Sequence, residues 1–401
     1  MKNHVLIFGG GLINKGAQAM TFIAVNEAKH LIPNAEITLF SSVDFYRESI
    51  NKYNYLFDIK PFSTQTLLYY LGGVYRVLSN IIGIKKHTKP DREIENILNS
   101  SCYMINVSGY ALSSKWGFKN CLTYLLTIKL MKKYQIETIL MPQSFGPFDF
   151  KGGKKIIHNY YAKKYLKYPK KIFAREEDGL KILVGEYGLK NVELSADMVL
   201  QNKGIDYDLL LKDIKKNIPS VPTDAVAIIP NVRSTEKSKV ALGKVYSDII
   251  QYYLNKNIPV VILSHSNFDE NLCKGIKDNF IDNPKVIYIN QELQSYEYQE
   301  LVERFRYVIA ARYHSIVHAY KANIPCITLG WAVKYYELMK LFNQEKYSIS
   351  VEKLDNKDAV IALIEDMETN LDQNKAMIKQ GLTRVQNNNC FNVLEGYFIH
   401  E

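Results

Sequence analysis

The stretch between residues 308 and 331 constrains the fold most, because it contains one complete βαβ unit. An apolar run at residues 307–310 is followed by the polar turn Arg312-Tyr313-His314 and by an amphipathic segment, and a second apolar run occupies residues 326–329. Two strands connected by a helix through short links pair in parallel within one sheet. Ligands of open parallel sheets bind beyond the carboxyl ends of the strands, so this turn is predicted to lie at a binding edge.

Arg312 and His314 in this turn have the chemistry to bind an anion and transfer a proton. A guanidinium binds a carboxylate or a phosphate through two parallel hydrogen bonds, and the amides that open the following helix add positive potential. An imidazole transfers protons near neutral pH. We therefore predict Arg312 and His314 as catalytic residues, with His318 one helical turn later as an alternative acid. An Arg-x-His pair also occurs by chance, so the pair alone leaves a structural role open.

The same alternation of apolar runs and helical patterns occurs in both halves of the chain. Apolar runs that predict strands lie at residues 5–9, 37–40, 103–107, 138–141 and 171–174, and then at 225–229, 259–263 and 286–289. With 401 residues the chain is too long for a single core. These patterns predict an α/β fold of two Rossmann-like domains that face a central cleft. The predicted limits are 1–205 for an N-terminal domain with a helical insertion around 51–92, 222–345 for a C-terminal domain, and 346–401 for terminal helices.

The turns that follow the predicted strands supply the other candidate residues. The first turn, Gly9-Gly10-Gly11, lacks the spacing of a dinucleotide fingerprint, and no acidic residue ends the second strand. Its glycines allow the close approach of a ligand or of a neighbouring helix. The residues predicted to contact substrate are Gly10, Asn14, Gln143, Ser144, Arg175, Arg233, His265 and Tyr313.

Several of these candidates also have a structural interpretation. Arg233 could face solvent, Arg175 could pair with an adjacent glutamate, and His265 could merely shape its turn. The polar residues of the turn at 142–147 could bind sugar hydroxyls or only define that turn. For Asp197, which follows a predicted strand, two roles are open: orienting an arginine or capping a helix.

A net charge of +10 suits an anionic substrate, a nucleic acid or an anionic membrane surface. The lysines are spread over several predicted helices and no nucleic-acid motif accompanies them, so no nucleic-acid partner is expected, and a solvated helical face is the simpler interpretation. No run of about 18 apolar residues predicts a membrane span. The chain enters a strand directly after its start, which leaves no room for a signal peptide. Five scattered cysteines without a C-x-x-C pair predict neither a metal site nor disulfides. We expect a cytoplasmic protein, and peripheral contact with the inner membrane face is left open.

In their order and spacing, these turns resemble those of the polysaccharide pyruvyl transferase family. The matching pieces extend from about residue 5 to residue 342 and are Gly9-Gly10-Gly11 with Asn14-x-Gly16, Pro142-Gln143-Ser144-x-Gly146-Pro147, Ala174-Arg175-Glu176-Glu177, Ala196-Asp197, Ser264-His265, and Arg312-Tyr313-His314-Ser315 with Gly330. Two pieces depart from the family pattern. The third strand ends in Asn106-Val107-Ser108-Gly109 instead of a glycine cluster, and a tyrosine follows Arg312 instead of a small aliphatic residue.

The resemblance implies an architecture similar to that of two-domain glycosyltransferases of the B type, and it implies a reaction. Family members move the enolpyruvyl unit of phosphoenolpyruvate onto a sugar as a ketal. The expected partners are therefore phosphoenolpyruvate, bound on the C-terminal side as the donor substrate, and a surface polysaccharide or lipid-linked oligosaccharide, bound on the N-terminal side as the acceptor. No cofactor is expected. His314 is expected to protonate the methylene carbon while Arg312 and Arg175 hold the anion.

Two other functions stay open at this point. A glycosyltransferase that uses a nucleotide sugar would share the fold, and its diphosphate would suit a cationic cleft. A non-catalytic anion-binding or scaffolding protein of an envelope pathway is the third alternative. Stabilisation by phosphoenolpyruvate or by nucleotide sugars separates the first two functions, and glycan-dependent phosphate release would exclude the third.

Overall fold

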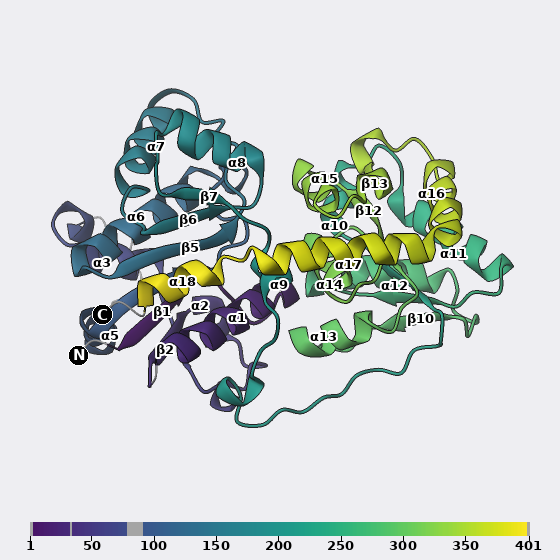
Figure 1. The fold of residues 1–401 in the computed structure, drawn as a ribbon, viewed down its shortest axis with the longest axis horizontal. Helices are drawn as coiled ribbons and strands as arrows, with labels where there is room; N and C mark the ends of the chain where they lie inside the picture. The colour runs from purple at the N-terminus through teal and green to yellow at the C-terminus, as the bar shows by residue number, and fades with distance from the viewer. Residues whose placement is uncertain (1–2, 33, 78–90, 399–401) are drawn as a thin grey trace.

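The computed structural model describes residues 3–32, 34–77 and 91–398, which form two α/β domains, each around one parallel sheet (Figure 1). The N-terminal sheet has the strand order β3-β2-β1-β4-β5-β6-β7 and the C-terminal sheet the order β10-β9-β8-β11-β12-β13. In each sheet the chain first adds strands on one side of the first strand (β1 or β8) and then continues on its other side, as in doubly wound folds. The strands are β1 (His4–Phe8), β2 (Glu36–Phe40), β3 (Asp58–Lys60), β4 (Ser101–Asn106), β5 (Glu137–Gln143), β6 (Lys171–Ala174), β7 (Val192–Leu194), β8 (Val226–Ile229), β9 (Val260–Leu263), β10 (Val286–Ile289), β11 (Val308–Ala310), β12 (Cys326–Gly330) and β13 (Ser348–Ser350).

Helices cover both faces of each sheet (Figure 1). In the first half of the chain they are α1 (Lys15–Leu31), α2 (Ser42–Tyr46), α3 (Thr64–Leu71), α5 (Arg92–Ser100), α6 (Phe118–Tyr134), α7 (Gly152–Tyr165), α8 (Glu177–Lys181) and α9 (Met198–Gln201). In the second half they are α10 (Val232–Lys237), α11 (Leu242–Asn255), α12 (Glu270–Asp278), α13 (Ser295–Val302), α14 (Tyr313–Lys321), α15 (Val333–Lys340), α16 (Asp358–Thr369), α17 (Leu371–Asn387) and α18 (Phe391–Phe398).

The position of β1 inside the sheet accounts for the apolar run in its sequence. Val5 and Ile7 pack in the layer that holds α1, whereas Leu6 and Phe8 pack in the layer of α3, α5 and α6. Because both faces of the strand are buried, the positions from Val5 to Phe8 are all apolar and do not alternate with polar residues.

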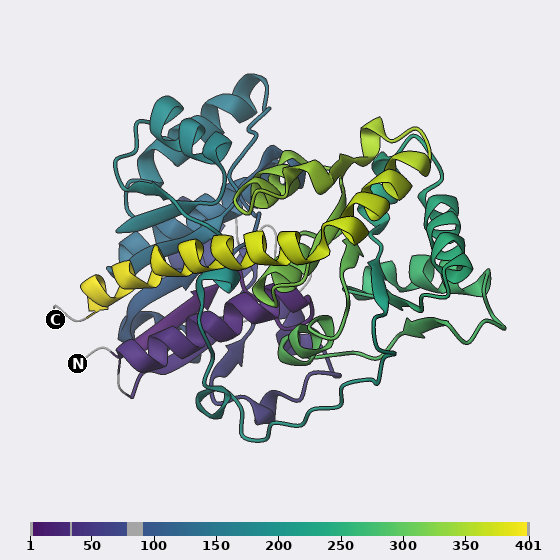
Figure 2. The same cartoon turned by 45° about the vertical axis from the view of Figure 1, so that its right-hand side comes forward.

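The two domains contact each other through α1, which packs against α13 and α14. The side chain of Gln18 in α1 donates a hydrogen bond to Oε1 of Gln294 at 2.6 Å and accepts one from the amide of Ser295 at 2.6 Å. The terminal helices α17 and α18 cross back from the C-terminal domain to the N-terminal one (Figure 2). There the hydroxyl of Tyr103 donates to the carbonyl of Tyr397 at 3.4 Å.

The prediction of an α/β fold with two Rossmann-like domains is confirmed. The strands β3, β7 and β13 were not predicted, and they lie at the edges of the two sheets. In the predicted insertion around 51–92, the described residues include β3 and α3, and α3 buries Leu67 and Leu68 against α6. Residues 78–90 of that segment lie outside the described residues. In the described ranges, none of the helices combines the length and the apolar character that crossing a bilayer requires.

Candidate active site

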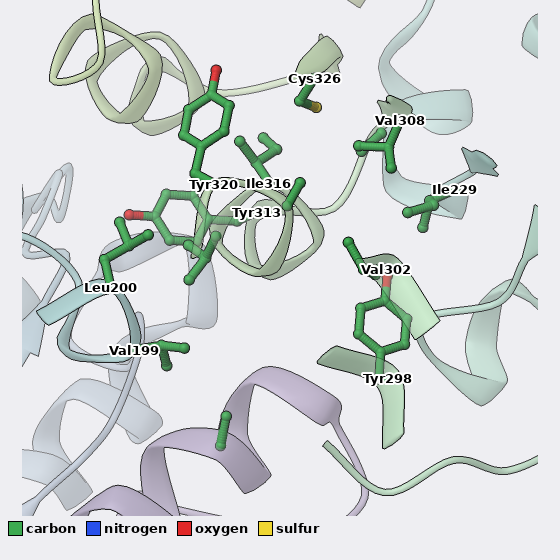
Figure 3. Packing of buried hydrophobic residues seen from close by; sticks show 14 of the residues in the cluster. Val199, Leu200, Ile229, Tyr298, Val302, Val308, Tyr313, Ile316, Tyr320 and Cys326 are labelled. Carbon is green, nitrogen blue, oxygen red and sulfur yellow. The ribbon is translucent and has the colours of Figure 1, made fainter. Parts of the chain in front are cut away.

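Helix α14 carries its first residues to the boundary between the domains. Arg312 is the N-cap of the helix and His314 lies in its first turn, so the predicted polar turn is in fact the start of the helix. Helix α14 packs against α9 and α1 of the N-terminal half. Figure 3 shows Leu200 of α9 beside Tyr313 of α14. The turn thus faces the other domain.

Gly16 allows the ring of His314 to contact the start of α1. A methyl group added at Gly16 would lie 2.1 Å from Cγ of His314, and one added at Gly109 would lie 3.8 Å from Cε1. The first distance is a collision, so a side chain at position 16 would displace the imidazole. Asn14 opens the same helix, because its Oδ1 accepts hydrogen bonds from the amides of Gly16 and Ala17 at 3.0 and 3.2 Å. His314 therefore reaches from one domain to the loops of the other.

The imidazole of His314 is surrounded by charges of both signs. Its Nε2 is buried, lies 3.7 Å from Oδ2 of Asp197 and has no hydrogen-bond partner among the described residues. Burial lowers the pKa of His314 to about 4; Asp197 opposes this decrease, and Arg175 and Lys334 add to it. The ring is therefore mostly uncharged at neutral pH in the free protein. Negative charge from a ligand would raise its pKa again.

Arg175 is fixed on the N-terminal side of this group. Its Nη1 donates to Oδ2 of Asp197 at 2.6 Å, and its Nη2 donates to the carbonyl of Gly109 at 2.6 Å and to Oγ of Ser144 at 2.9 Å. The guanidinium also lies over the ring of Tyr313, 4.5 Å from its centroid. Asp197 caps α9 as well, so both roles considered for it are present.

Arg312 is oriented by a carboxylate that sequence patterns did not reveal. Its Nε and Nη2 donate to the two oxygens of Asp269 at 2.7 and 2.6 Å. Asp269 is fully buried in the loop after β9 and also accepts a hydrogen bond from the amide of Val232 at 3.1 Å. This two-pronged ion pair fixes the plane of the guanidinium, and Nη1 takes no part in it. The side chain of Arg312 stays 20% exposed, so a ligand can reach it.

Lys334 near the start of α15 was also missed. Its Nζ lies among four aromatic rings, at 4.8 Å from the centroid of Tyr110, 5.2 Å from Tyr313, 5.7 Å from Trp331 and 5.8 Å from Tyr335. In the part of the chain that the structure describes, no carboxylate lies within ion-pairing distance of it. Burial and the neighbouring cations lower the pKa of Lys334 to about 7. Aromatic faces stabilise an ammonium without neutralising it, so Lys334 is available to an anion.

His265 and Lys15 add further buried groups near this boundary. His265 is 1% exposed, and neither of its ring nitrogens has a hydrogen-bond partner among the residues described. Burial, Arg312 and the other histidines keep its pKa well below the usual range. Lys15 at the start of α1 is 5% exposed, and burial lowers its pKa.

Three predicted substrate contacts have structural roles or lie elsewhere. Gln143 is fully buried, and its Oε1 accepts a hydrogen bond from Tyr124 at 2.9 Å. Gly10 lies so close to α1 that an added methyl group would meet Oγ1 of Thr21 at 2.4 Å. Arg233 has a side chain that is 61% exposed and pairs with Glu236 on its own helix. The structure therefore does not bring these side chains to His314.

An open pocket of about 360 Å³ adjoins the site in the N-terminal domain. It lies at the carboxyl ends of β1 and β4, and the side chains that line it are polar but uncharged or aromatic. They include Asn106, Ser108, Tyr110, Trp116 and Asn120. Tyr110 belongs both to this pocket and to the rings around the neighbouring lysine of α15, so the two spaces share a wall.

Comparisons with known proteins identify a family and a fold. A family model described as polysaccharide pyruvyl transferase matches residues 14–332. No match was found among curated proteins. Of the solved structures, a UDP-GlcNAc 2-epimerase from Neisseria meningitidis is 11% identical, with 99% of this chain and 100% of that chain covered and a TM-score of 0.57. A glycosyltransferase from Rickettsia africae is 13% identical, with 99% and 97% covered and a TM-score of 0.53. At such identities the likeness shows the fold, a two-domain arrangement of the glycosyltransferase-B type.

Proposed function

Since this chain belongs to the polysaccharide pyruvyl transferase family, we propose that it transfers the pyruvyl unit of phosphoenolpyruvate to a glycan as a ketal. The observation that carries the proposal is the buried Nε2 of His314, which has no hydrogen-bond partner among the described residues and lies near Arg175 and Lys334 where the two domains meet. Arg312 in turn acts on Lys334. A donor with a carboxylate and a phosphate needs several fixed cations, and its enol carbon needs an acid.

The donor would bind to the cations of the C-terminal domain. Arg312 offers the part of its guanidinium that Asp269 leaves unbonded, and Lys334 offers an ammonium that has no ion-pair partner among the described residues. Arg175 already forms an ion pair with Asp197. Its role is therefore to add positive electrostatic potential to the site and to hold the carboxylate of Asp197 near His314. Fixed charges of this kind stabilise the departing phosphate without having to reorganise.

His314 would act as the acid only after the donor has bound. In the free protein its pKa is about 4 because of burial. The negative charge of the donor would raise that pKa, so proton uptake accompanies binding. The proton then passes from Nε2 to the methylene carbon, which becomes a methyl group, and C2 becomes electron-deficient. Two sugar hydroxyls bond to C2 and release their protons while the C2–O bond to phosphate breaks, which gives the ketal and inorganic phosphate.

The uncharged pocket of the N-terminal domain suits the acceptor. A sugar ring stacks its C–H groups on aromatic faces such as Trp116, and planar amides such as Asn106 and Asn120 match pairs of neighbouring hydroxyls. Because Tyr110 lines both this pocket and the space around Lys334, a sugar diol bound there would lie beside the donor. Holding both reactants in such an arrangement supplies much of the rate of reactions between two bound molecules.

The experiment that tests the function is glycan-dependent release of phosphate from phosphoenolpyruvate, with mass spectrometry of the glycan to detect the ketal. The wild type is expected to release phosphate only with a suitable pyranoside from a glycoside panel, and His314→Gln and Arg312→Gln are expected to lose this activity while they stay folded. Transfer of a sugar from a nucleotide sugar, without any response to phosphoenolpyruvate, would support the glycosyltransferase alternative and overturn the proposal.

A further inference from the structure

Helix α7 presents an exposed face whose composition the reaction does not explain. Residues 151–170, which contain the helix, include seven lysines and no acidic residue. Lys170 pairs with Glu137. The lysines on α7 and just before it are exposed, and they are Lys151, Lys154, Lys155, Lys163 and Lys164.

The same face also exposes large apolar side chains. Ile156 is 72% exposed, Ile157 43% and Tyr160 56%. Residues 156, 160 and 163 lie on consecutive turns of the helix, so apolar and basic side chains share one surface. The opposite face is packed, because His158 and Ala162 are buried. Burial of its other side thus fixes the orientation of this basic and apolar face.

The surface continues onto the segment that follows α3. Val74 and Val77 there are 68% and 58% exposed. The hydroxyls of Tyr75 and Tyr161 share a hydrogen bond of 2.6 Å that joins this segment to α7, and Nζ of Lys129 lies 3.8 Å from the ring centroid of Tyr75. The segment with the exposed valines is thus attached to the helix that carries the exposed isoleucines and lysines.

This surface lies next to the uncharged pocket. Helix α7 follows β5 through a short loop, and the ring of Phe150 at the end of that loop contacts Phe118 edge-on with centroids 5.6 Å apart. Phe118 begins α6 directly after η2 (Ser114–Trp116), and Trp116 of η2 lines the pocket with 45% of its surface exposed. A partner bound to α7 would therefore lie beside the pocket entrance.

We propose that this surface, formed by α7 and residues 74–77, docks on an anionic membrane. Apolar side chains that insert at the level of the headgroups, flanked by lysines that attract anionic lipid, are what interfacial binding requires. The inference rests on the proposed function in one respect: it places the acceptor on a lipid at that membrane, where the pocket next to α7 can receive its glycan.

Vesicle flotation of the full chain tests the inference. The wild type is expected to bind vesicles of phosphatidylcholine with phosphatidylglycerol, to bind less as salt is raised, and not to bind phosphatidylcholine alone. Replacing both isoleucines in the double variant Ile156→Asp, Ile157→Asp is expected to abolish binding. The double variant Lys154→Gln, Lys155→Gln is expected to weaken it on the order of tenfold. The matched control carries Ile281→Asp and Lys274→Gln, both exposed in the C-terminal domain, and is expected to bind as the wild type does.

Three results would overturn the inference: no binding of the wild type to anionic vesicles, unchanged binding of the α7 variants, or a wild-type dimer that the α7 variants dissociate without any vesicle binding. Phosphoenolpyruvate binding is measured separately on the wild type. A failure on vesicles therefore leaves the proposed function standing, and a failure of donor binding leaves the docking result standing.

Discussion

Lys334 has an ammonium group whose nearest partners are aromatic rings, and this makes its charge sensitive to pH. With its pKa lowered to about 7 by burial, Lys334 is charged below neutrality and loses its charge above it. If the charged form binds the donor, then beyond the decrease caused by the need to protonate His314, kcat/KM for phosphoenolpyruvate falls by a further factor of about five between pH 7 and pH 8. Lys334→Arg keeps its charge over this range and is expected to remove that further decrease. A wild-type profile that is flat up to pH 9 would contradict this role.

Gly16 provides a test of the position of His314. Gly16→Ala is expected to push the imidazole away from the start of α1 and to lower glycan-dependent phosphate release on the order of a hundredfold. Gly243→Ala is the matched control, since it also lies at the second position of a helix and an added methyl group there meets nothing within 4 Å. The control is expected to keep full activity. Wild-type turnover of Gly16→Ala would show that the ring does not need this position.

At the residue scale, the sequence predicts groups that follow strands but not their partners. Arg312 and His314 stand out because they follow an apolar run. Asp269, which holds Arg312, lies far from it in the sequence on a different loop. Lys334 is a single lysine in a lysine-rich chain, and what sets it apart is a ring such as Tyr110, which the other domain supplies. Such contacts exist only after both sheets have formed.

At the scale of elements, clearly apolar runs were predictable and the three-residue edge strands were not. The apolar runs predicted as strands at 171–174 and 259–263 correspond closely to β6 and β9. In contrast, β7 and β13 have three residues each and carry polar or exposed side chains. An edge strand is buried less than a central one, so its sequence shows no apolar run and its pairing depends on the neighbouring strand.

Helix α14 places two uncharged histidines in the interior, and this predicts that the protein is sensitive to acid. Burial lowers the pKa of His314 to about 4 and that of His318 to about 3, from 6.5. The unfolded chain takes up these protons below pH 6.5 and the folded chain does not, so stability decreases as pH falls from 6.5 towards 4. Between pH 7 and pH 5 the loss is on the order of 2 kcal/mol for each histidine.

Urea unfolding at pH 7 and pH 5 measures this loss. His318→Gln is expected to reduce the difference between the two pH values. His30→Gln replaces an exposed histidine of α1 and serves as the control that leaves the difference unchanged. Equal free energies of unfolding at both pH values in the wild type would show that these histidines titrate alike in the folded and unfolded chain.

At the scale of the whole molecule, the site is complete only where the two domains meet. The C-terminal domain supplies Arg312, His314 and Lys334, whereas Asp197 and the glycine that receives the imidazole come from the N-terminal half. Helices α17 and α18 connect the two domains a second time (Figure 2). The presence of two domains was predictable from the repeated alternation of strands and helices. The way the domains pack against each other was not, because it depends on single polar side chains such as Gln18, which no sequence pattern singles out.

Calorimetric titration with phosphoenolpyruvate tests the central claim, that a doubly anionic donor binds between the domains at His314, most directly. The wild type is expected to bind with uptake of a proton, Lys334→Gln to bind about ten to a hundred times more weakly, and Arg233→Gln, at its exposed position, to bind as the wild type does. Absence of binding to the wild type, or a loss of affinity with Arg233→Gln but not with Lys334→Gln, would contradict the claim.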